Sequence, residues 1–198
     1  MPIPTNEEIR ALHERYAPSP EAFHLVYTHS QIVCGIAEQL LGRCEAGIDA
    51  DLVRAGSLLH DIGVYLLYGP SGEIDRADYV RHGVIGHDLL AGEGIAEELC
   101  RFCSCHTGMG LSRTDIRRQG LPIPAGDYLA ESVEEEVVMY ADKFHSKTDP
   151  PVFVSTASYL ASLRRFGDDK ASRFQSMMER FGEPDLAPLM SAHGHGLR

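Results

Sequence analysis

Apolar residues recur at helical spacing along nearly the whole chain. Val33, Ile36 and Leu40 are three and four residues apart, and similar stripes follow in later segments. No alternation of apolar and polar residues persists over a useful length, so we expect no sheet. The 198 residues suffice for one core that is stable without disulfides. We therefore predict an all-α fold, a helical bundle that residues 1–198 form as a single domain.

Prolines, glycines and capping residues mark where these helices begin and end. Ser19 precedes Pro20, which suits the first turn of a helix, and we expect this helix to run to about Cys44. The other expected helices start near Thr5, Asp49, Ser112 and Ser132 or span residues 76–92, 94–106, 152–166 and 169–181.

The predicted domain has three parts. Residues of about 20–150 form the core that carries the candidate functional side chains, and residues of about 151–182 form the C-terminal helices. We expect residues 183–198 to be a flexible tail, because Gly194 and Gly196 surround His195 there and terminal segments are often poorly ordered. His195 is accordingly expected to have no role in a functional site.

The charge balance narrows the range of partners. The chain has 18 Lys and Arg residues against 29 Asp and Glu residues, a net charge of −11. This balance disfavours a broad basic face for duplex nucleic acid or for a membrane surface. A small phosphorylated ligand needs only a few local cations, so it is compatible with an acidic chain.

We expect a cytoplasmic location. The first residues lack the basic and apolar regions of a signal peptide, and no window approaches about 18 uninterrupted apolar residues. Five cysteines cannot all pair, so free thiols in a reducing compartment are the expectation. Cys100, Cys103 and Cys105 include one Cys-x-x-Cys pair without a second, which fits small buried side chains better than a zinc site.

Six ionisable side chains lie on or next to the apolar, core-facing sides of the predicted helices. Burying imidazole and carboxylate groups costs free energy unless they are paired or bind a cation. Helical bundles build metal sites from such side chains on facing helices, and this mixture of ligands suits Zn, Mn, Fe or Co better than Ca. The candidate metal ligands are His29, His60, Asp61, His82, His106 and Asp142.

Each candidate also has a purely structural interpretation, because a single inward histidine is more often a hydrogen-bonded core residue than a ligand. The joint pattern favours a metal. It is also selective, since His87 follows His82 by five residues and the two side chains point about 140° apart on a helix. We expect His82 to face the centre, with the small residues Gly83 and Gly86 beside it.

The segment Leu58-Leu59-His60-Asp61-Ile62-Gly63 resembles the signature of HD-domain metal-dependent phosphohydrolases, in the branch named for His-Asp-Ile-Gly. The similarity extends in family order over roughly residues 25–147. The matching segments are Tyr27-Thr28-His29-Ser30, Arg81-His82-Gly83, Cys105-His106-Thr107-Gly108 and Tyr140-Ala141-Asp142-Lys143.

The resemblance implies the two-metal variant of this family. It implies that one metal is held by His29, His60, Asp61 and Asp142. It implies that His82 and His106 hold the second metal and that Asp61 bridges both. The implied cofactors are two divalent transition metals from the set Fe, Mn, Zn, Co and Ni.

The activity that the resemblance implies is hydrolysis of a phosphoester or phosphoanhydride by a metal-activated hydroxide. The substrate would be a nucleotide or another small phosphorylated molecule. Candidate cations for binding its phosphate are Arg81, Arg113 and Lys143, each next to or shortly after an expected ligand. Lys143 is also a candidate catalytic residue together with Asp61, and Lys147 lies one helical turn further. The alternative for each cation is a solvated surface charge.

Two other functions stay open at this stage. Some relatives with the same six ligands hold two irons and activate dioxygen to cleave C–C or C–P bonds. A metal-stabilised module without activity is the third possibility. We do not expect the activity of extended HD-type cyclic dinucleotide phosphodiesterases, because the chain lacks their His-His-Glu and Gly-Tyr-Pro elements. The sequence does not decide the metal, the substrate or the oligomeric state.

Overall fold

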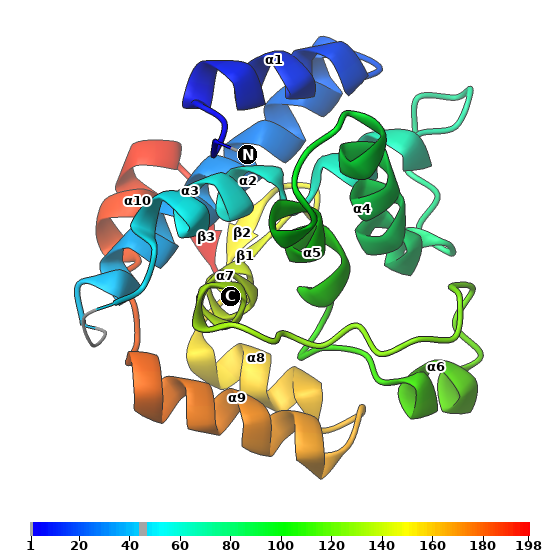
Figure 1. The fold of residues 1–198 in the computed structure, drawn as a ribbon. Helices are drawn as coiled ribbons and strands as arrows, with labels where there is room; N and C mark the ends of the chain where they lie inside the picture. Colours follow the sequence, from blue (N-terminus) through cyan, green and yellow to red (C-terminus); the bar gives the residue numbers. More distant parts are fainter. Residues whose placement is uncertain (1, 44–46) are drawn as a thin grey trace.

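The computed structural model describes residues 2–43 and 47–198, and the fold is mainly helical, as the apolar spacing predicts (Figure 1). The α-helices are α1 (Asn6–Tyr16), α2 (Pro20–Leu41), α3 (Ala50–Leu59), α4 (His82–Gly92), α5 (Glu97–Cys105), α6 (Arg113–Gln119), α7 (Val133–Asp142), α8 (Thr156–Leu163), α9 (Asp168–Phe181) and α10 (Ala187–His193). Two 3₁₀ helices, η1 (Ile62–Leu67) and η2 (Tyr79–Arg81), and three short strands, β1 (His145–Ser146), β2 (Val152–Phe153) and β3 (Gly196–Leu197), complete the described elements.

Side chains cap the helices at the positions that the sequence indicates. Thr5 and Glu8 form a reciprocal capping box at α1, and Ser132 and Glu135 form another at α7. Ser19 directly precedes Pro20, the first residue of α2, and its hydroxyl accepts a hydrogen bond from the backbone N–H of Ala22. This helix ends at Leu41, and the expected end at Cys44 lies outside the described residues.

Helix α2 forms the centre of the core. Its residues Val26, Ile32 and Ile36 are fully buried, and each such side chain stabilises the fold by about 1.5–3 kcal/mol. Helix α2 packs against α3 and α7, and α5 packs against α3, α4 and α7. Helices α8 and α9 lie together against α7 in Figure 1. The helices that carry the candidate ligands therefore enclose one common space.

The C-terminal segment corrects one expectation, because β3 forms part of a sheet where we expected none. The flexibility expected of residues 183–198 stays a prediction. Within the described residues, β2 pairs antiparallel with β1 and parallel with β3 in a three-stranded sheet. Leu189 of α10 packs over Gly35 of α2, and Phe153 of β2 is fully buried. Strands of two residues are too short to give an alternating pattern, so the sequence could not indicate them.

Residues 76–92 do not form the single helix that we expected. The Asp75 carboxylate accepts bonds from the backbone N–H groups of Ala77 at 2.9 Å and Asp78 at 3.4 Å. Such a local turn competes with helix formation. The chain then passes through η2, and α4 begins only at His82.

The cysteines fit their expected role as small apolar residues. Cys34, Cys100, Cys103 and Cys105 are free and buried, while Cys44 lies outside the described residues. Burial raises the pKa of Cys34 and of Cys105 to about 12, so both thiols stay protonated near neutral pH.

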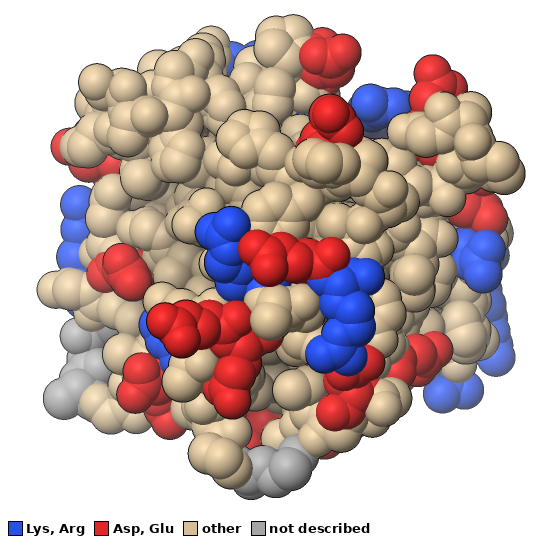
Figure 2. Space-filling model, turned by 90° about the horizontal axis from the view of Figure 1, so that it is seen from above, with Lys and Arg blue, Asp and Glu red and all other residues tan. Residues whose placement is uncertain are grey.

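Charged side chains of both signs are interspersed on the face in Figure 2. This distribution agrees with the many exposed ion pairs, such as Arg10 with Glu14 at 2.8 Å and Arg180 with Glu136, which contribute little stability. In the described part of the chain, no helix has both the length and the apolar character that crossing a membrane requires.

Gly63 sets how closely η1 can approach α4. A Cβ atom at Gly63 would lie 2.1 Å from the His82 carbonyl oxygen and 2.5 Å from the backbone nitrogen of Gly86. Real Cβ atoms do not come this close to backbone atoms, so any other residue at position 63 must push the two elements apart. This contact places Asp61, the residue after His60, next to the first turn of α4.

We therefore expect Gly63→Ala to destabilise the protein by at least about 2 kcal/mol, since the crowded atoms belong to the backbone. Denaturant unfolding measures this change. Gly92→Ala is the matched control, because no atom lies within 4 Å of a Cβ built there. Equal stability of both variants would contradict the close packing of η1 on α4.

Candidate metal centre

The candidate ligands come from the ends or the middle of five helices. His29 lies in the middle of α2, and Asp142 is the last residue of α7. His60 follows α3, and Asp61 occupies the turn before η1 with φ −109° and ψ 8°, a conformation common in active sites. His82 begins α4 and His106 follows α5. All six side chains point into the same space.

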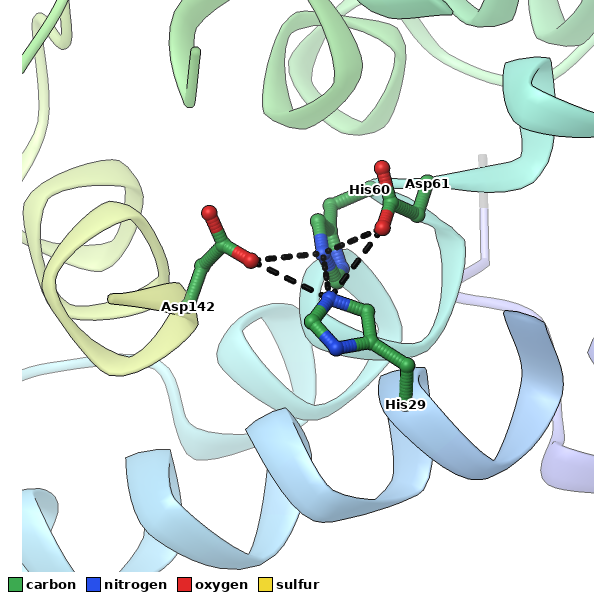
Figure 3. A group of neighbouring side chains, drawn as sticks. All are labelled: His29, His60, Asp61 and Asp142. Carbon is green, nitrogen blue, oxygen red and sulfur yellow. Dashed lines mark hydrogen bonds and ion pairs between the residues drawn. The ribbon is translucent and has the colours of Figure 1, made fainter. Parts of the chain in front are cut away.

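The first group of ligands contains His29, His60, Asp61 and Asp142, which Figure 3 shows pointing toward one another. The Nε2 atom of His29 lies 3.1 Å from Asp61 Oδ2 and 3.1 Å from Asp142 Oδ1. The Nε2 atom of His60 lies 3.4 Å and 3.6 Å from the same two oxygens. These distances gather two imidazoles and two carboxylates around one point.

The second group contains Asp61, His82 and His106. Asp61 Oδ1 lies 3.4 Å from His82 Nε2 and 3.6 Å from His106 Nε2, and these two nitrogens are 3.0 Å apart. The two oxygens of Asp61 therefore face different groups, Oδ2 toward the first and Oδ1 toward the second. The two groups contain the residues that the resemblance assigns to the two metals, and their role as ligands stays a prediction.

Hydrogen bonds on the outer side of three rings define which nitrogen faces the centre. Nδ1 of His60 lies 2.7 Å from the Ser57 carbonyl, Nδ1 of His82 lies 2.5 Å from the Tyr79 carbonyl, and Nδ1 of His106 lies 2.9 Å from the Phe102 carbonyl. A carbonyl only accepts, so each Nδ1 carries the proton. In the neutral rings, each Nε2 then presents a lone pair to the centre.

This donor set fits divalent cations. The lone pairs of His82 and His106 meet at 3.0 Å, an arrangement that repels unless a positive charge lies between them. Asp61 Oδ1 is buried and has no hydrogen-bond partner among the described residues. Burying such an oxygen without a partner costs free energy, and a cation would satisfy it.

The protonation states of the histidines are consistent with a bound divalent cation. Burial lowers the pKa of His82 to about 4 and also lowers the pKa of His106, which keeps both rings neutral near pH 7. Burial opposes the charged form of His60, but Asp61 and Asp142 raise its pKa to about 9. Metal binding at the first group is therefore expected to release a proton from His60.

Two lysines accompany the two carboxylates. Lys143 Nζ donates to Asp142 Oδ2 at 2.7 Å and to the His106 carbonyl at 2.9 Å, and Lys147 Nζ donates to Asp61 Oδ2. Burial opposes their charge, but Asp142 raises the pKa of Lys143 and Asp61 raises that of Lys147. Against the effect of burial, Lys147 and His60 hold the pKa of Asp61 well below its usual range.

The outer nitrogen of His29 leads to His145, which the sequence did not point to, and through it to His195, which we expected to have no role. His29 Nδ1 lies 2.9 Å from His145 Nδ1, and His145 Nε2 lies 2.9 Å from His195 Nδ1. If His29 presents a lone pair at Nε2, its Nδ1 proton donates to His145, which in turn donates to His195. Burial and the neighbouring His29 lower the pKa of His145 to about 2, so the ring can accept.

The structure does not bring Arg81 and Arg113 to the centre. Arg81 pairs with Asp78 at 3.0 Å on the surface, and Arg113 is exposed at the start of α6. Neighbours in a helical turn point about 100° apart, so adjacency to His82 does not direct Arg81 inward.

A cavity of about 480 Å³ opens beside Asp142, and a smaller one of about 260 Å³ reaches Asp61, His82 and His106. The larger cavity is lined by Lys143 and Lys147 and by three cations that our sequence reasoning missed, Arg76, Arg165 and Arg198. These arginines come from segments outside the ligand motifs, so no motif pointed to them.

The comparison with protein families identifies the class of this protein. The family model described as HD domain matches residues 26–147, more than half of the chain. The matched region contains all six candidate ligands. The chain therefore belongs to the HD domain family.

The curated relatives that match are longer than the shared region. A tRNA (cytidine(56)-2′-O)-methyltransferase of Picrophilus torridus is 30% identical over 128 residues, which are 65% of this chain and 33% of that protein. An uncharacterized protein of Methanocaldococcus jannaschii is 36% identical over 95 residues, which are 48% of this chain and 49% of that protein. The chain thus spans about half or less of the length of these relatives.

Among solved structures, the HD domain of the L. monocytogenes phosphodiesterase PgpH has the same fold. It superposes with a TM-score of 0.55 and 16% identity, covering 95% of this chain and 100% of that domain. The same domain in complex with cyclic-di-AMP superposes with a TM-score of 0.53 and 15% identity, covering 93% of this chain and 96% of that domain. At this level of identity the similarity establishes the fold.

Metal removal is expected to destabilise the protein. A bound ion stabilises the folded chain in proportion to the logarithm of its concentration over Kd, so chelation of a tight site should lower the Tm by on the order of 10 °C. Differential scanning calorimetry before and after verified metal removal measures this shift. Asp61→Asn is the control, since its Tm should respond little to metal. An unchanged Tm of the unmodified chain would contradict a buried metal centre.

His145→Ala is expected to weaken metal binding about 10- to 100-fold, because His29 loses the acceptor that orients its ring. Competition with a fluorescent chelator measures the affinity. His145→Asn should recover part of it, since the amide oxygen can accept from His29. His87→Ala serves as control, because His87 contacts Ser104 at 3.2 Å instead of a ligand. Unchanged affinity in His145→Ala would remove His145 from the support of the centre.

Proposed function

We propose that this chain is a metal-dependent phosphohydrolase that cleaves a phosphoester or phosphoanhydride of a nucleotide or another small phosphorylated molecule. The observation that carries the proposal is Asp61, whose two oxygens face two separate groups of ligand nitrogens. Membership of the HD domain family supports it. The name of PgpH as a phosphodiesterase, and its complex with cyclic-di-AMP, support a small nucleotide as substrate.

We assign two divalent ions to this centre, from the set Fe, Mn, Zn, Co and Ni. His29, His60, Asp61 and Asp142 would hold one ion, and Asp61, His82 and His106 would hold the other. Bound ions of this kind bring the pKa of a coordinated water close to neutral and neutralise phosphoryl oxygens.

The protein contributes a fixed arrangement of charge. Asp61 spans the two groups, and Lys147 helps keep its carboxylate ionised. Lys143 holds Asp142 Oδ2, which leaves Oδ1 directed at His29. Both lysines also line the larger cavity, where an ammonium group can donate to phosphoryl oxygens as their charge shifts. We retain Lys143 as a substrate-binding and catalytic candidate and add Lys147, whereas Arg81 and Arg113 lie outside both cavities beside the centre.

We do not assign methyl transfer to this chain. The methyltransferases of Picrophilus torridus and Thermoplasma volcanium share with it about a third of their length. A nucleotide substrate is compatible with the cytoplasmic location that the sequence predicts.

The test is a turnover assay with chain loaded separately with Mn²⁺, Fe²⁺, Co²⁺, Ni²⁺ or Zn²⁺. The panel contains a chromogenic phosphoester, nucleoside mono-, di- and triphosphates, diadenosine tetraphosphate and cyclic-di-AMP. Phosphate or a nucleotide product should appear without oxygen consumption, and His60→Ala and Asp61→Asn should lower turnover at least about 1,000-fold. His87→Ala should retain activity.

Three outcomes would contradict the proposal. The first is full activity in metal-stripped Asp61→Asn protein. The second is oxygen consumption with cleavage of a C–C or C–P bond by the iron-loaded chain, which would establish a di-iron oxygenase. The third is no turnover with any metal, which would favour a metal-stabilised module.

A further inference from the structure

The larger cavity has the opposite charge to the chain as a whole. The net charge of the protein is −11, yet this cavity is lined by five cationic side chains and by one acidic side chain, that of Asp142. The two lysines already contact Asp142 and Asp61. The positive charge that no carboxylate of the described residues balances belongs to the other three side chains, Arg76, Arg165 and Arg198.

These three arginines are not paired with carboxylates in the part of the chain that the structure describes. Some exposed arginines elsewhere are paired, such as Arg15 with Glu93 at 2.6 Å and Arg81 with Asp78 at 3.0 Å, whereas Arg113, Arg117 and Arg164 also have no carboxylate partner among the described residues. One unpaired surface arginine is ordinary. Three exposed arginines that line one cavity combine their positive charge there, and this charge attracts an anion.

The fold holds the three arginines at the cavity from distant parts of the sequence. Arg198 is fixed on β2, because its backbone nitrogen donates to the Phe153 carbonyl at 2.9 Å and its carbonyl accepts from Ser155 at 2.8 Å. Arg165 follows α8, and its guanidinium lies 4.7 Å from the ring of Phe166. Arg76 lies in the loop before η2. Ser158, Ser162 and Thr148 add hydroxyl groups to the lining.

We propose that Arg76, Arg165 and Arg198 form an anion subsite that binds a second phosphate group of the substrate while the reacting phosphate lies at the metal centre. The guanidinium group suits this task because its planar N–H groups match phosphate oxygens in pairs. The substrate is then a small molecule with at least two phosphate groups, in preference to a monophosphate. This inference rests on the proposed function for the position of the reacting phosphate.

The experiment is a calorimetric titration of Mn²⁺-loaded protein with methylphosphonate and with methylenediphosphonate. Both probes resist hydrolysis, and they differ by one anionic group. The unmodified chain should bind the diphosphonate at least about 10-fold more tightly. Arg165→Ala and Arg198→Ala should each lower only the diphosphonate affinity, by about 10-fold, the value of one charge-assisted contact. Metal content is measured after each titration, because a diphosphonate can also extract metal.

Arg113→Ala is the matched control, since it removes an exposed arginine outside the cavity and should change neither affinity. Arg165→Lys keeps the positive charge, so it should retain part of the preference for the diphosphonate. The subsite is wrong if the arginine variants bind both probes as the unmodified chain does, if they lose both affinities equally, or if the unmodified chain does not prefer the diphosphonate. These results do not depend on turnover, so an inactive protein with the expected preference would refute the hydrolase and retain the subsite.

Discussion

The sharing of one buried carboxylate by two groups of ligands is the constraint on which the rest of this structure depends. Asp61 is 1% exposed, and its oxygens face His29 and His60 on one side and His82 and His106 on the other. Six ionisable side chains in the core would be strongly destabilising without compensation. Lysines and backbone carbonyls offset part of that cost, and the proposed cations would offset the rest.

The surrounding packing keeps this arrangement rigid. Gly63 and Gly86 let η1 lie directly against α4, which places Asp61 beside His82. Backbone carbonyls fix the ring orientation of His60, His82 and His106 from outside. Binding of the proposed ions would then require little rearrangement of these side chains, so little conformational entropy would be lost. The same rigidity would give the phosphate of the proposed substrate a fixed target at the edge of the cavity.

Much of the centre could be predicted from the sequence, because its ligands lie on or next to helices whose apolar spacing defines an inward face. His29 and Asp142 were recognised in this way, although more than 100 residues separate them. The contribution of His195 could not be predicted, since it depends on a two-residue strand without a periodic pattern. Arg165 and Arg198 reach the cavity through tertiary packing, whereas the direction of Arg81 was decided by a local turn.

The most direct test of the account is a crystal structure of the metal-loaded chain with anomalous scattering measured at the absorption edge of the metal. We expect two anomalous peaks, one on each side of the Asp61 carboxylate, with His29, His60 and Asp142 around one and His82 and His106 around the other. A map without peaks at this carboxylate, or with the histidine rings turned away from it, would contradict the central claim.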